Sequence, residues 1–375
     1  MGVNQEIIAS ARTALSQLVP GRKVAGLVPL GNGHINETFL VTFVTGELRQ
    51  VVLQRLNRAV FPEPEKIMAN LAILAEHLAA RVAREPPGGA DPRMVVRPLG
   101  GQDGRGFFDD PSGDFWRLIS YVEDAEHQEV LVTPELAREA GRGLGVFHRL
   151  VADLDPTLLV DTLPGFHCAP GYLAAYDRQF AAGQCGPALP GEDNCRAMIA
   201  ARRGLTEILE GAARRGEILP RVIHGDPRLA NLLFDRSSRQ AVALVDLDTV
   251  KPGLLHYDLG DCLRSCCNPA GDDLEDLAEV SFDLEICRGV LAGYLAEAGA
   301  TLSPVDYQLI YPAVRLLAFE LGLRFFSDHL AGDVYFKTTR PAQNLQRALV
   351  QFRLLESIEA QEVEIRAIVA AWQRQ

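Results

Sequence analysis

The sequence predicts a two-lobed α+β protein, with a small N-terminal β-sheet lobe and a larger, mainly helical C-terminal lobe. Its 375 residues are long for a single hydrophobic core, which favours two compact bodies. Alternation of apolar and polar residues dominates the N-terminal part, whereas apolar residues at helical spacing dominate the C-terminal part. We therefore place the lobes at residues 1–121 and 122–375.

The N-terminal lobe opens on an amphipathic helix over residues 1–19, which Pro20 and Gly21 end. Alternating apolar residues then predict three strands, a second helix follows, and an Arg-, Pro- and Gly-rich loop over 83–93 leads to two more strands. The predicted strands are Val24–Leu30, Glu37–Thr45, Arg49–Leu56, Met94–Leu99 and Phe115–Val122, and the second helix is Glu63–Val82.

The C-terminal lobe begins after a hinge at Tyr121–Glu126. Apolar residues at helical spacing predict a helix over Thr133–Leu150, in which we expect His148 to be structural. Gly, Pro and Cys interrupt the pattern over residues 164–201, which suggests an insertion near the substrate cleft. Four apolar helical patterns then fill residues 274–373.

Residues 222–250 carry the strongest functional signal in the chain. Asp226 follows an apolar lead-in within His-Gly-Asp, Asn231 comes five residues later, and Asp246 ends a second apolar run. Transfer of a γ-phosphoryl group needs a carboxylate that orients and deprotonates the acceptor hydroxyl, and oxygen ligands for Mg²⁺. Asp226 is the candidate base, Asn231 and Asp246 are candidate Mg²⁺ ligands, and Asp248 is a second-metal or supporting group. Each residue alone is also typical of a turn, a cap or a strand end, and their combination favours phosphoryl transfer.

A glycine-containing loop separates the first two predicted strands, with the sequence Gly-Asn-Gly-His-Ile-Asn-Glu-Thr over residues 31–38. Glycines at this place let backbone N–H groups approach phosphate oxygens without an intervening Cβ atom. A plain hairpin turn also explains two glycines, so the interpretation depends on the downstream motif. The candidate nucleotide-binding residues here are Gly31, Asn32, Gly33, Asn36 and Thr38.

A kinase-like phosphate site also needs a cation on the third strand. None of the four lysines lies there, and Gln54-Arg55 occupies the place. Arg55 is the candidate phosphate ligand, although its planar guanidinium differs from a lysine ammonium. Glu63 and Glu65 are possible partners for Arg55, and solvated helix-start carboxylates explain them equally well.

The His-Gly-Asp order, with Gly where protein kinases have Arg, resembles the aminoglycoside phosphotransferase and choline kinase branch of the kinase-like fold. The segments 31–38, 222–250, 252–264 and 319–336 further resemble the N-acetylhexosamine 1-kinases. This resemblance implies a two-lobed protein-kinase-like fold, adenine bound by hinge backbone groups, ATP and Mg²⁺ as cofactors, and phosphorylation of the anomeric hydroxyl of an N-acetylhexosamine. It also implies that His34, Arg324 and Tyr335 contact the sugar, together with Asp226.

Two further features have structural interpretations. Asp258 and Asp261 follow the predicted metal strand, and we expect them to serve as structural hydrogen-bond acceptors. Arg324 lies inside an apolar helix, where a buried guanidinium usually needs a partner and a carboxylate is the ordinary candidate.

The composition limits the classes of partner. A formal net charge of −12 disfavours nucleic acid and anionic membranes. The N-terminal residues contain neither a basic segment nor a long apolar run, so we expect a cytoplasmic protein that binds ATP and a small amino sugar. One alternative is a kinase for a cationic acceptor such as choline or an aminoglycoside, which the acidic balance favours. A nucleotide- or sugar-binding pseudokinase is another, motivated by the missing strand lysine, and the presence of Asp226, Asn231 and Asp246 argues against it.

Overall fold

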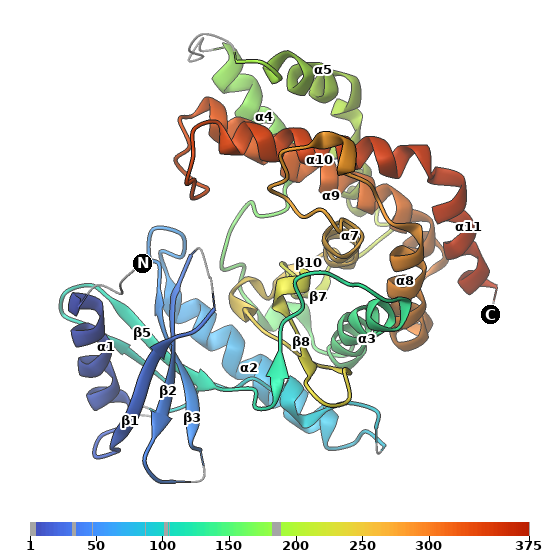
Figure 1. Ribbon diagram of the computed structural model, residues 1–375. Helices are drawn as coiled ribbons and strands as arrows, with labels where there is room; N and C mark the ends of the chain where they lie inside the picture. The colour runs from blue at the N-terminus through green and yellow to red at the C-terminus, as the bar shows by residue number, and fades with distance from the viewer. Residues whose placement is uncertain are drawn as a thin grey trace. The chain divides into compact units, whose positions relative to one another are not determined.

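The computed structural model describes residues 5–31, 35–46, 48–86, 88–100, 104, 106–181 and 189–374. Its chain forms two compact units, seen as a mainly β and a mainly helical part in Figure 1. The N-terminal unit comprises Met1–Ala125, Leu154–Pro164 and Val245–Lys251, and the C-terminal unit comprises Glu126–Asp153, Gly165–Leu244 and Pro252–Gln375. A lobe boundary between residues 121 and 122 stays a prediction.

An antiparallel five-stranded sheet with strand order β1-β2-β3-β5-β4 forms the centre of the N-terminal unit. Its strands are β1 (Val24–Pro29), β2 (Glu37–Phe43), β3 (Gln50–Leu56), β4 (Phe107–Asp109) and β5 (Phe115–Ser120). Four of the five predicted strands are confirmed. The predicted strand Met94–Leu99 is wrong, because this segment has only a 3₁₀ turn, Pro92–Met94, and an isolated bridge between Pro98 and Ile119. Proline has no N–H group to donate to a ladder, and the short strand β4 takes the edge position instead.

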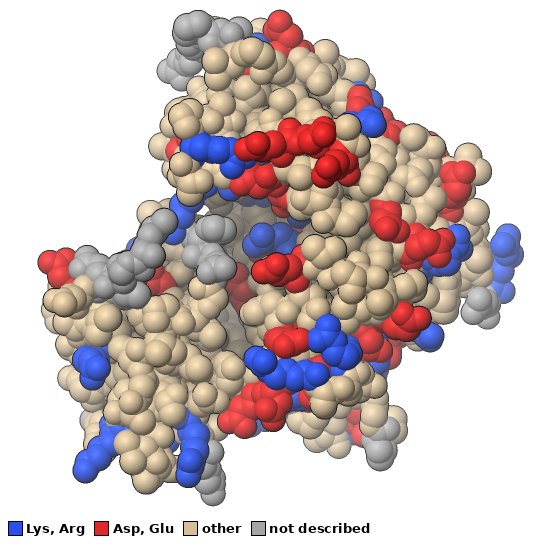
Figure 2. Space-filling model, in the orientation of Figure 1, with Lys and Arg blue, Asp and Glu red and all other residues tan. Residues whose placement is uncertain are grey.

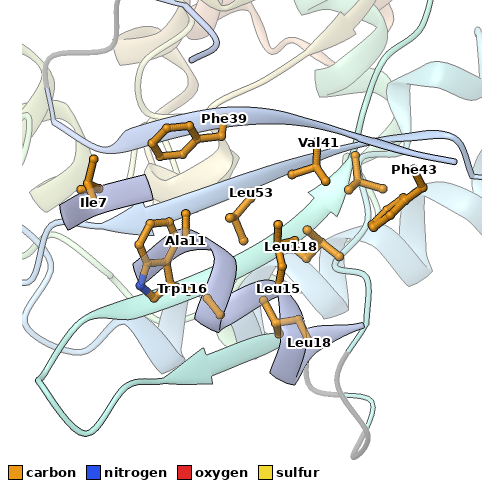
Figure 3. Close-up of a cluster of buried hydrophobic side chains, with 12 residues drawn as sticks. Ile7, Ala11, Leu15, Leu18, Phe39, Val41, Phe43, Leu53, Trp116 and Leu118 are labelled. Atoms are coloured by element: carbon orange, nitrogen blue, oxygen red, sulfur yellow. The ribbon is translucent and has the colours of Figure 1, made fainter. Parts of the chain in front are cut away.

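Each face of this sheet packs against one helix. The face that carries Phe39, Leu53 and Leu118 buries them against α1 (Gln5–Leu18), whose apolar residues recur at helical spacing (Figure 3). The opposite face packs Leu56 and Phe115 against residues of α2 (Pro64–Val82). Because side chains alternate along a strand, neighbouring residues such as Gln54 and Arg55 project to different faces.

Helices make up most of the C-terminal unit. They are α3 (Pro134–Leu150), α4 (Ala169–Ala181), α5 (Glu192–Arg202), α6 (Glu207–Arg214), α7 (Leu255–Cys266), α8 (Leu284–Ala298), α9 (Pro304–Leu330), α10 (Gln343–Ala360) and α11 (Glu362–Gln373). Short strands accompany them: β6 (Ala125–Glu126), β8 (Leu232–Asp235) and β9 (Ala241–Leu244) form one sheet, and β7 (Arg221–Ile223) and β10 (Lys251–Gly253) form another. The predicted helix over Thr133–Leu150 and the four helices near the C-terminus are confirmed, and the interrupted segment 164–201 contains α4 and α5.

Helices α3 and α8 approach each other unusually closely. A Cβ atom added to Gly141 on α3 would lie 1.9 Å from the carbonyl oxygen of Val290, and one added to Gly293 on α8 would lie 1.9 Å from the carbonyl oxygen of Arg138. Such contacts are shorter than any that real Cβ atoms make. The two glycines therefore set the distance between these helices.

The surface carries both signs of charge. Figure 2 shows Lys and Arg side chains scattered among Asp and Glu side chains on the face that it presents. Within the described ranges, no helix is both long enough and apolar enough to cross a bilayer.

Candidate functional site

The loop that carries Asp226 is fixed by a buried carboxylate of α7. Strand β7 ends at Ile223, and Gly225 adopts a left-handed backbone conformation with φ of 88°. Asp258 accepts hydrogen bonds from the backbone nitrogens of His224 (2.6 Å) and Gly225 (2.8 Å), and its Oδ2 lies 2.9 Å from Nε2 of His148. The expected structural roles of Asp258 and His148 are thus confirmed.

Asp226 and Asn231 lie together at the end of this loop. Asn231 donates from Nδ2 to the backbone oxygen of Asp226 (2.8 Å) and to its Oδ2 (3.2 Å). Arg228, which the sequence analysis did not single out, forms a two-point contact with the same carboxylate through Nε (2.6 Å) and Nη2 (3.0 Å). The spacing of Arg228, two residues after Asp226, was the available sequence signal.

The environment of Asp226 favours its ionised form. Burial alone would raise the pKa of this carboxyl group, and the charge and hydrogen bonds of Arg228 outweigh that effect, so the pKa of Asp226 is lowered. Asp226 is therefore a carboxylate at neutral pH. A carboxylate in this position can accept a hydrogen bond from an acceptor hydroxyl and take its proton.

A second buried pair, His167 and Glu320, lies behind the same loop. Nδ1 of His167 is 2.9 Å from Oε1 of Glu320 on α9, and Nε2 of His167 is 2.8 Å from the carbonyl oxygen of Gly225. Because a carboxylate and a carbonyl oxygen only accept hydrogen bonds, both ring nitrogens must carry protons. His167 is therefore an imidazolium, which agrees with a raised pKa: burial lowers the pKa of His167, and the charge and hydrogen bond of Glu320 outweigh it.

Sequence reasoning missed this pair for a physical reason. His167 lies in a Gly- and Pro-interrupted segment, and Glu320 lies in an apolar helix more than a hundred residues later. The only local signal was a carboxylate among apolar neighbours of α9, since a buried charge usually has a partner.

Arg324 lies one turn after Glu320 on α9 and is surrounded by aromatic rings. Its guanidinium carbon is 5.0 Å from the ring centre of Phe166, 5.1 Å from Tyr172, 5.4 Å from Phe336 and 6.0 Å from Tyr335. Among the residues that the structure describes, Arg324 has no hydrogen-bond or ion-pair partner, so the expected carboxylate partner is not found. Cation–π contacts stabilise it instead.

The structure brings Tyr335 to Arg324 through a well-defined turn. Asp333 adopts a left-handed conformation, and buried Asp328 accepts hydrogen bonds from the backbone nitrogens of Val334 (3.0 Å), Tyr335 (2.7 Å) and Phe336 (2.9 Å). The turn is thereby fixed, while the Tyr335 side chain is about half exposed. The two sugar-contact candidates of the C-terminal unit therefore lie side by side, and their role in sugar binding stays a prediction.

In the N-terminal unit, only part of the glycine loop can be described. Gly31 has a left-handed backbone with φ of 72°, while Asn32, Gly33 and the sugar-contact candidate His34 lie outside the described residues. Asn36 donates from Nδ2 to Oδ2 of Asp248 (2.8 Å) and accepts from the backbone nitrogen of Asn57 (3.1 Å). Asn36 thus ties the glycine loop to the segment that follows β9.

Three polar side chains form a row across β2, β3 and β5. Thr38 lies opposite Gln54, and Gln54 lies opposite Arg117. Gln54 donates to Oγ1 of Thr38 (3.0 Å) and accepts from Nε (2.9 Å) and Nη2 (2.7 Å) of Arg117. Nη2 of Arg117 also lies 2.5 Å from Oδ1 of Asp248, and each of these two side chains is only 2% exposed.

Arg55 lies on the other face of the sheet. It pairs with Asp114 (3.0 Å) and Glu37 (3.0 Å), and neither Glu63 nor Glu65 is its partner. Those two carboxylates pair with Lys66 and Arg58. The nucleotide role of Arg55 stays a prediction, and the buried cation on the face of Gln54 is Arg117, which comes from the neighbouring strand.

The predicted metal ligands can be judged one by one. Asp246 lies two residues after the end of β9 and adopts a left-handed conformation (φ 62°, ψ 55°), which is uncommon for a residue with a Cβ atom. Asp248 Oδ1 is buried and accepts no well-oriented hydrogen bond from the described residues, despite its contact with Arg117. Asn231 uses its amide nitrogen on Asp226, so its side-chain oxygen is the atom left for a cation.

The chemistry of the predicted metal ligands is that of a Mg²⁺ site rather than of a structural metal site. No group of three His, Cys, Asp or Glu side chains in the described part of the chain could hold a metal ion. Mg²⁺ typically binds to one or two carboxylates plus substrate phosphate oxygens rather than to a complete protein cage. Asn231, Asp246 and Asp248 each carry a side-chain oxygen, the kind of ligand that Mg²⁺ binds, and their role as metal ligands stays a prediction.

Solved structures share this fold. An ethanolamine kinase from Plasmodium vivax is 13% identical, with a TM-score of 0.58 over 94% of this chain and 91% of that one. An aminoglycoside phosphotransferase from Alicyclobacillus acidocaldarius is 14% identical, with a TM-score of 0.59 over 96% of both chains. The GDP complex of aminoglycoside 2′-phosphotransferase-IIIa is 15% identical, with a TM-score of 0.56 over 94% of this chain and 99% of that one. These likenesses confirm the protein-kinase-like fold that the sequence predicts.

A comparison of the sequence with family profiles identifies the family. A profile of the phosphotransferase enzyme family matches residues 26–290, which include the glycine loop, the Asp226 loop and the segment with Asp246 and Asp248. This match spans most of the chain, and we conclude that the chain belongs to the phosphotransferase enzyme family.

Proposed function

We propose that the protein is an ATP-dependent small-molecule kinase that phosphorylates the anomeric hydroxyl of an N-acetylhexosamine. Membership of the phosphotransferase family supports the class of reaction, and a fold neighbour that binds GDP supports a nucleotide as phosphoryl donor. The choice of acceptor depends on the C-terminal unit. The observation that carries it is Arg324, a guanidinium held among aromatic rings without a carboxylate partner in the described residues.

The charge at Arg324 separates the candidate acceptors. Burial lowers the pKa of Arg324, but the neighbouring Tyr172 and Glu320 more than offset this effect and the pKa is raised, so the group remains a cation. A cation with free donors favours a neutral acceptor with oxygen atoms, such as the hydroxyl and acetamide oxygens of an amino sugar. Aromatic rings that stack on sugar faces complete a suitable surface. His34, Arg324 and Tyr335 are the sugar-contact residues in this proposal.

Asp226 performs the proton transfer in the proposed reaction. The sugar oxygen forms a bond to the γ-phosphorus of ATP as the bond between that phosphorus and the ADP oxygen breaks, and the hydroxyl proton passes to the Asp226 carboxylate. Arg228 holds this carboxylate in position at two points. Asn231, Asp246 and Asp248 are the residues that would hold Mg²⁺, and the ion would neutralise polyphosphate charge. Gly31, Asn32, Gly33, Asn36, Thr38 and Arg55 are the proposed nucleotide-binding residues.

A kinase for a cationic acceptor is the second candidate. The names of the fold neighbours favour it, because ethanolamine and aminoglycosides are amines. Arg324 opposes it, since the positive charge would repel an ammonium group from the same aromatic surface. A pseudokinase is a weaker candidate, because Asp226 is held beside Asn231 by defined hydrogen bonds.

A screen of nucleoside diphosphate release, ADP from ATP or GDP from GTP, separates the three functions. Purified protein is incubated with MgATP or MgGTP and with N-acetylglucosamine, N-acetylgalactosamine, glucose, choline, ethanolamine or kanamycin. The proposal expects ADP release with an N-acetylhexosamine and a product whose phosphate is on the anomeric carbon by ³¹P NMR. Preferential turnover of choline, ethanolamine or kanamycin supports the second candidate, and nucleotide binding without turnover of any acceptor supports a pseudokinase.

A further inference from the structure

Glu320 has one carboxylate oxygen that the fold does not use. Oε1 receives the hydrogen bond from His167, whereas Oε2 is buried and accepts no hydrogen bond from any residue that the structure describes. Glu320 is only 1% exposed, so water does not replace the missing donor freely. Leaving a buried acceptor of this kind unpaired is costly, so the atom calls for an explanation, and a bound ligand is one that its surroundings can test.

The His167–Glu320 pair is connected directly to the loop that carries Asp226. His167 bridges Glu320 and the carbonyl oxygen of Gly225, the residue immediately before Asp226. The ring of His167 also stacks on Tyr257 at 5.2 Å, with an angle of 12° between the planes. The imidazolium therefore fixes the Glu320 carboxylate relative to the Asp226 loop. It contacts only Oε1, so Oε2 of Glu320 is not used in this interaction.

The same carboxylate lies near the aromatic cluster around Arg324. Its charge influences both Arg324 and Tyr172: burial is the largest cause that raises the pKa of Tyr172 to about 12, and Glu320 contributes in the same direction. No ion pair joins Glu320 to Arg324 among the described residues, although the two are one helical turn apart. Arg324 thus keeps its donors and Glu320 keeps an acceptor in one region.

We propose that Glu320 Oε2 accepts a hydrogen bond from a hydroxyl or N–H group of the acceptor substrate, which makes Glu320 a specificity residue for that substrate. This inference rests on the proposed kinase function, because it concerns the molecule that receives the phosphate. Arg324 has only donors and Glu320 Oε2 has only lone pairs, so together they match a molecule that carries both oxygen acceptors and O–H or N–H donors. A quaternary ammonium alcohol has no donor left once its single hydroxyl faces Asp226.

Two variants of Glu320 test the contact. Glu320→Gln keeps the shape and removes the charge, and Glu320→Leu removes both oxygens. We expect the dissociation constant of N-acetylglucosamine, measured by calorimetry in the presence of Mg²⁺ and a non-hydrolysable ATP analogue, to rise at least about tenfold in both, since hydrogen bonds to charged groups are the strong ones. The dissociation constant of the nucleotide should stay unchanged. Glu192→Gln is the matched control, because Glu192 is also buried and also pairs with a histidine, His329.

A hydroxyl-deletion series identifies the group that donates. Binding of N-acetylglucosamine is compared with that of its 3-, 4- and 6-deoxy analogues in the parent protein and in Glu320→Gln. For the hydroxyl that contacts Glu320, removal weakens binding to the parent but not to the variant, because the contact is already lost. If no deletion series shows this coupling, the same comparison with the N-methylated acetamide tests the amide N–H.

The outcomes distinguish this inference from the proposed function. If the parent phosphorylates ethanolamine or kanamycin instead of an amino sugar, the proposed acceptor is wrong, and the Glu320 variants are measured with the acceptor that is turned over. If a Glu320 variant with an intact cooperative melt binds that acceptor as tightly as the parent does, the inference is overturned while the kinase function stands. Absence of turnover with every acceptor overturns both. Should Glu320→Leu fail to fold, the isosteric Glu320→Gln alone decides.

Discussion

Asp226 is the residue on which the proposed chemistry depends most directly. Replacing it with Asn keeps the side-chain size and part of the contact with Arg228, but removes the proton acceptor. General-base groups contribute roughly 10²- to 10⁴-fold to rate, so kcat should fall within that range while the nucleotide dissociation constant changes little. Steady-state kinetics and nucleotide titration check this prediction.

The matched comparison for Asp226→Asn is Asp246→Asn, which should weaken binding of the Mg-nucleotide instead. Asp193→Asn, at a carboxylate that is 97% exposed, is the neutral control. An Asp226→Asn protein with parental turnover would remove Asp226 from the base role and with it the central proposal.

Arg324 is the residue on which the proposed choice of acceptor depends. Arg324→Ala removes the donors and leaves four rings around an empty volume, whereas Arg324→Lys keeps a cation that also binds aromatic faces. Each unpaired polar contact costs about 1–3 kcal/mol, so Arg324→Ala should weaken acceptor binding more than Arg324→Lys does. The dissociation constants of the acceptor and of ATP are measured for each variant, and we expect only the acceptor constant to change.

A loss of the cooperative melt in Arg324→Ala would mean that the guanidinium is needed for folding rather than for substrate. Full retention of sugar selectivity in a folded Arg324→Ala protein would instead leave a small-molecule kinase without its hexosamine assignment.

At the level of elements, the row Thr38–Gln54–Arg117 joins three strands to Asp248. Removing one member of a buried ion pair leaves the other charge buried without a partner, which destabilises the fold by about 3–5 kcal/mol. Arg117→Met should therefore lower the free energy of unfolding strongly, and adding Asp248→Asn should recover part of the loss. Urea unfolding of the two single variants and the double variant measures this coupling.

Arg55 provides the contrast on the opposite face. Its ion pairs with Asp114 and Glu37 are about one third exposed or more, so Arg55→Met should change stability by only about 0–1 kcal/mol. Nucleotide titration of the same proteins tests which arginine binds phosphate. A higher dissociation constant for ATP in Arg55→Met favours Arg55 as the phosphate ligand. A higher constant in Arg117→Met alone favours Arg117, on β5, as that ligand.

The contact between α3 and α8 gives a second element-scale prediction. Gly141→Ala would force a Cβ atom against the backbone of Val290, and one helix must move to accept it. Overpacking of this kind costs typically about 1–3 kcal/mol, and a clash with backbone lies at the upper end. Gly204→Ala, where nothing lies within 4 Å of the added atom, is the control. Thermal melts should fall clearly for the first variant and stay near the parent for the second.

The elements also show what sequence reasoning could supply. The periodicity of apolar residues correctly predicted the helices α1, α2 and α3 and the strands β1, β2, β3 and β5. Each of these elements buries one face, and its apolar residues recur at the spacing of that face. Periodicity failed at Met94–Leu99, where Pro98 blocks a regular ladder, and it missed β4, which is only three residues long. Short edge strands carry too few residues for alternation to be visible.

The candidate site divides in the same way. Asp226, Asn231, Asp246 and Asp248 could be predicted as site residues because they lie within one motif, whose spacing is a local property of the chain, and their roles stay predictions. Arg117, His167 and Glu320 were not found, because each becomes meaningful only beside a partner far away in sequence. Arg117 lies opposite Gln54 because of the register between β3 and β5. The sequence of β5 alone does not predict that pairing.

For the whole molecule, buried ionisable groups predict a limited pH range of stability. On the acid side, burial raises the pKa of Asp258, but hydrogen bonding to His148 and the charges around it prevail, so the folded-state pKa is lowered. Such a group stabilises the fold above its ordinary pKa, and this stabilisation is lost as the pH falls through the lowered value. Asp226 acts in the same direction. Acid should therefore destabilise the protein, and Asp258→Asn should reduce the dependence of the urea midpoint on pH below neutrality.

On the alkaline side, His167 sets the expected behaviour. Its pKa is raised above the ordinary value of 6.5 because the folded state holds it as an imidazolium between Glu320 and the Gly225 carbonyl. The corresponding stabilisation is complete below pH 6.5, and it is lost as the pH rises through the folded-state pKa, since the unfolded chain has by then released the proton. Buried cysteines such as Cys262, whose pKa is raised above its ordinary value of 9.0, add losses only at higher pH.

The informative range for His167 therefore lies between pH 6.5 and 9.0, and urea midpoints measured across it test the charge state directly. The parent midpoint should fall over this range, and the His167→Gln midpoint should vary much less, because Gln keeps a donor for Glu320 or for Gly225 but does not titrate. A parent protein whose midpoint is flat across this range would contradict an imidazolium at His167. Glu320 would then have a neutral partner, and its unused oxygen would be the only feature of this pair left to explain.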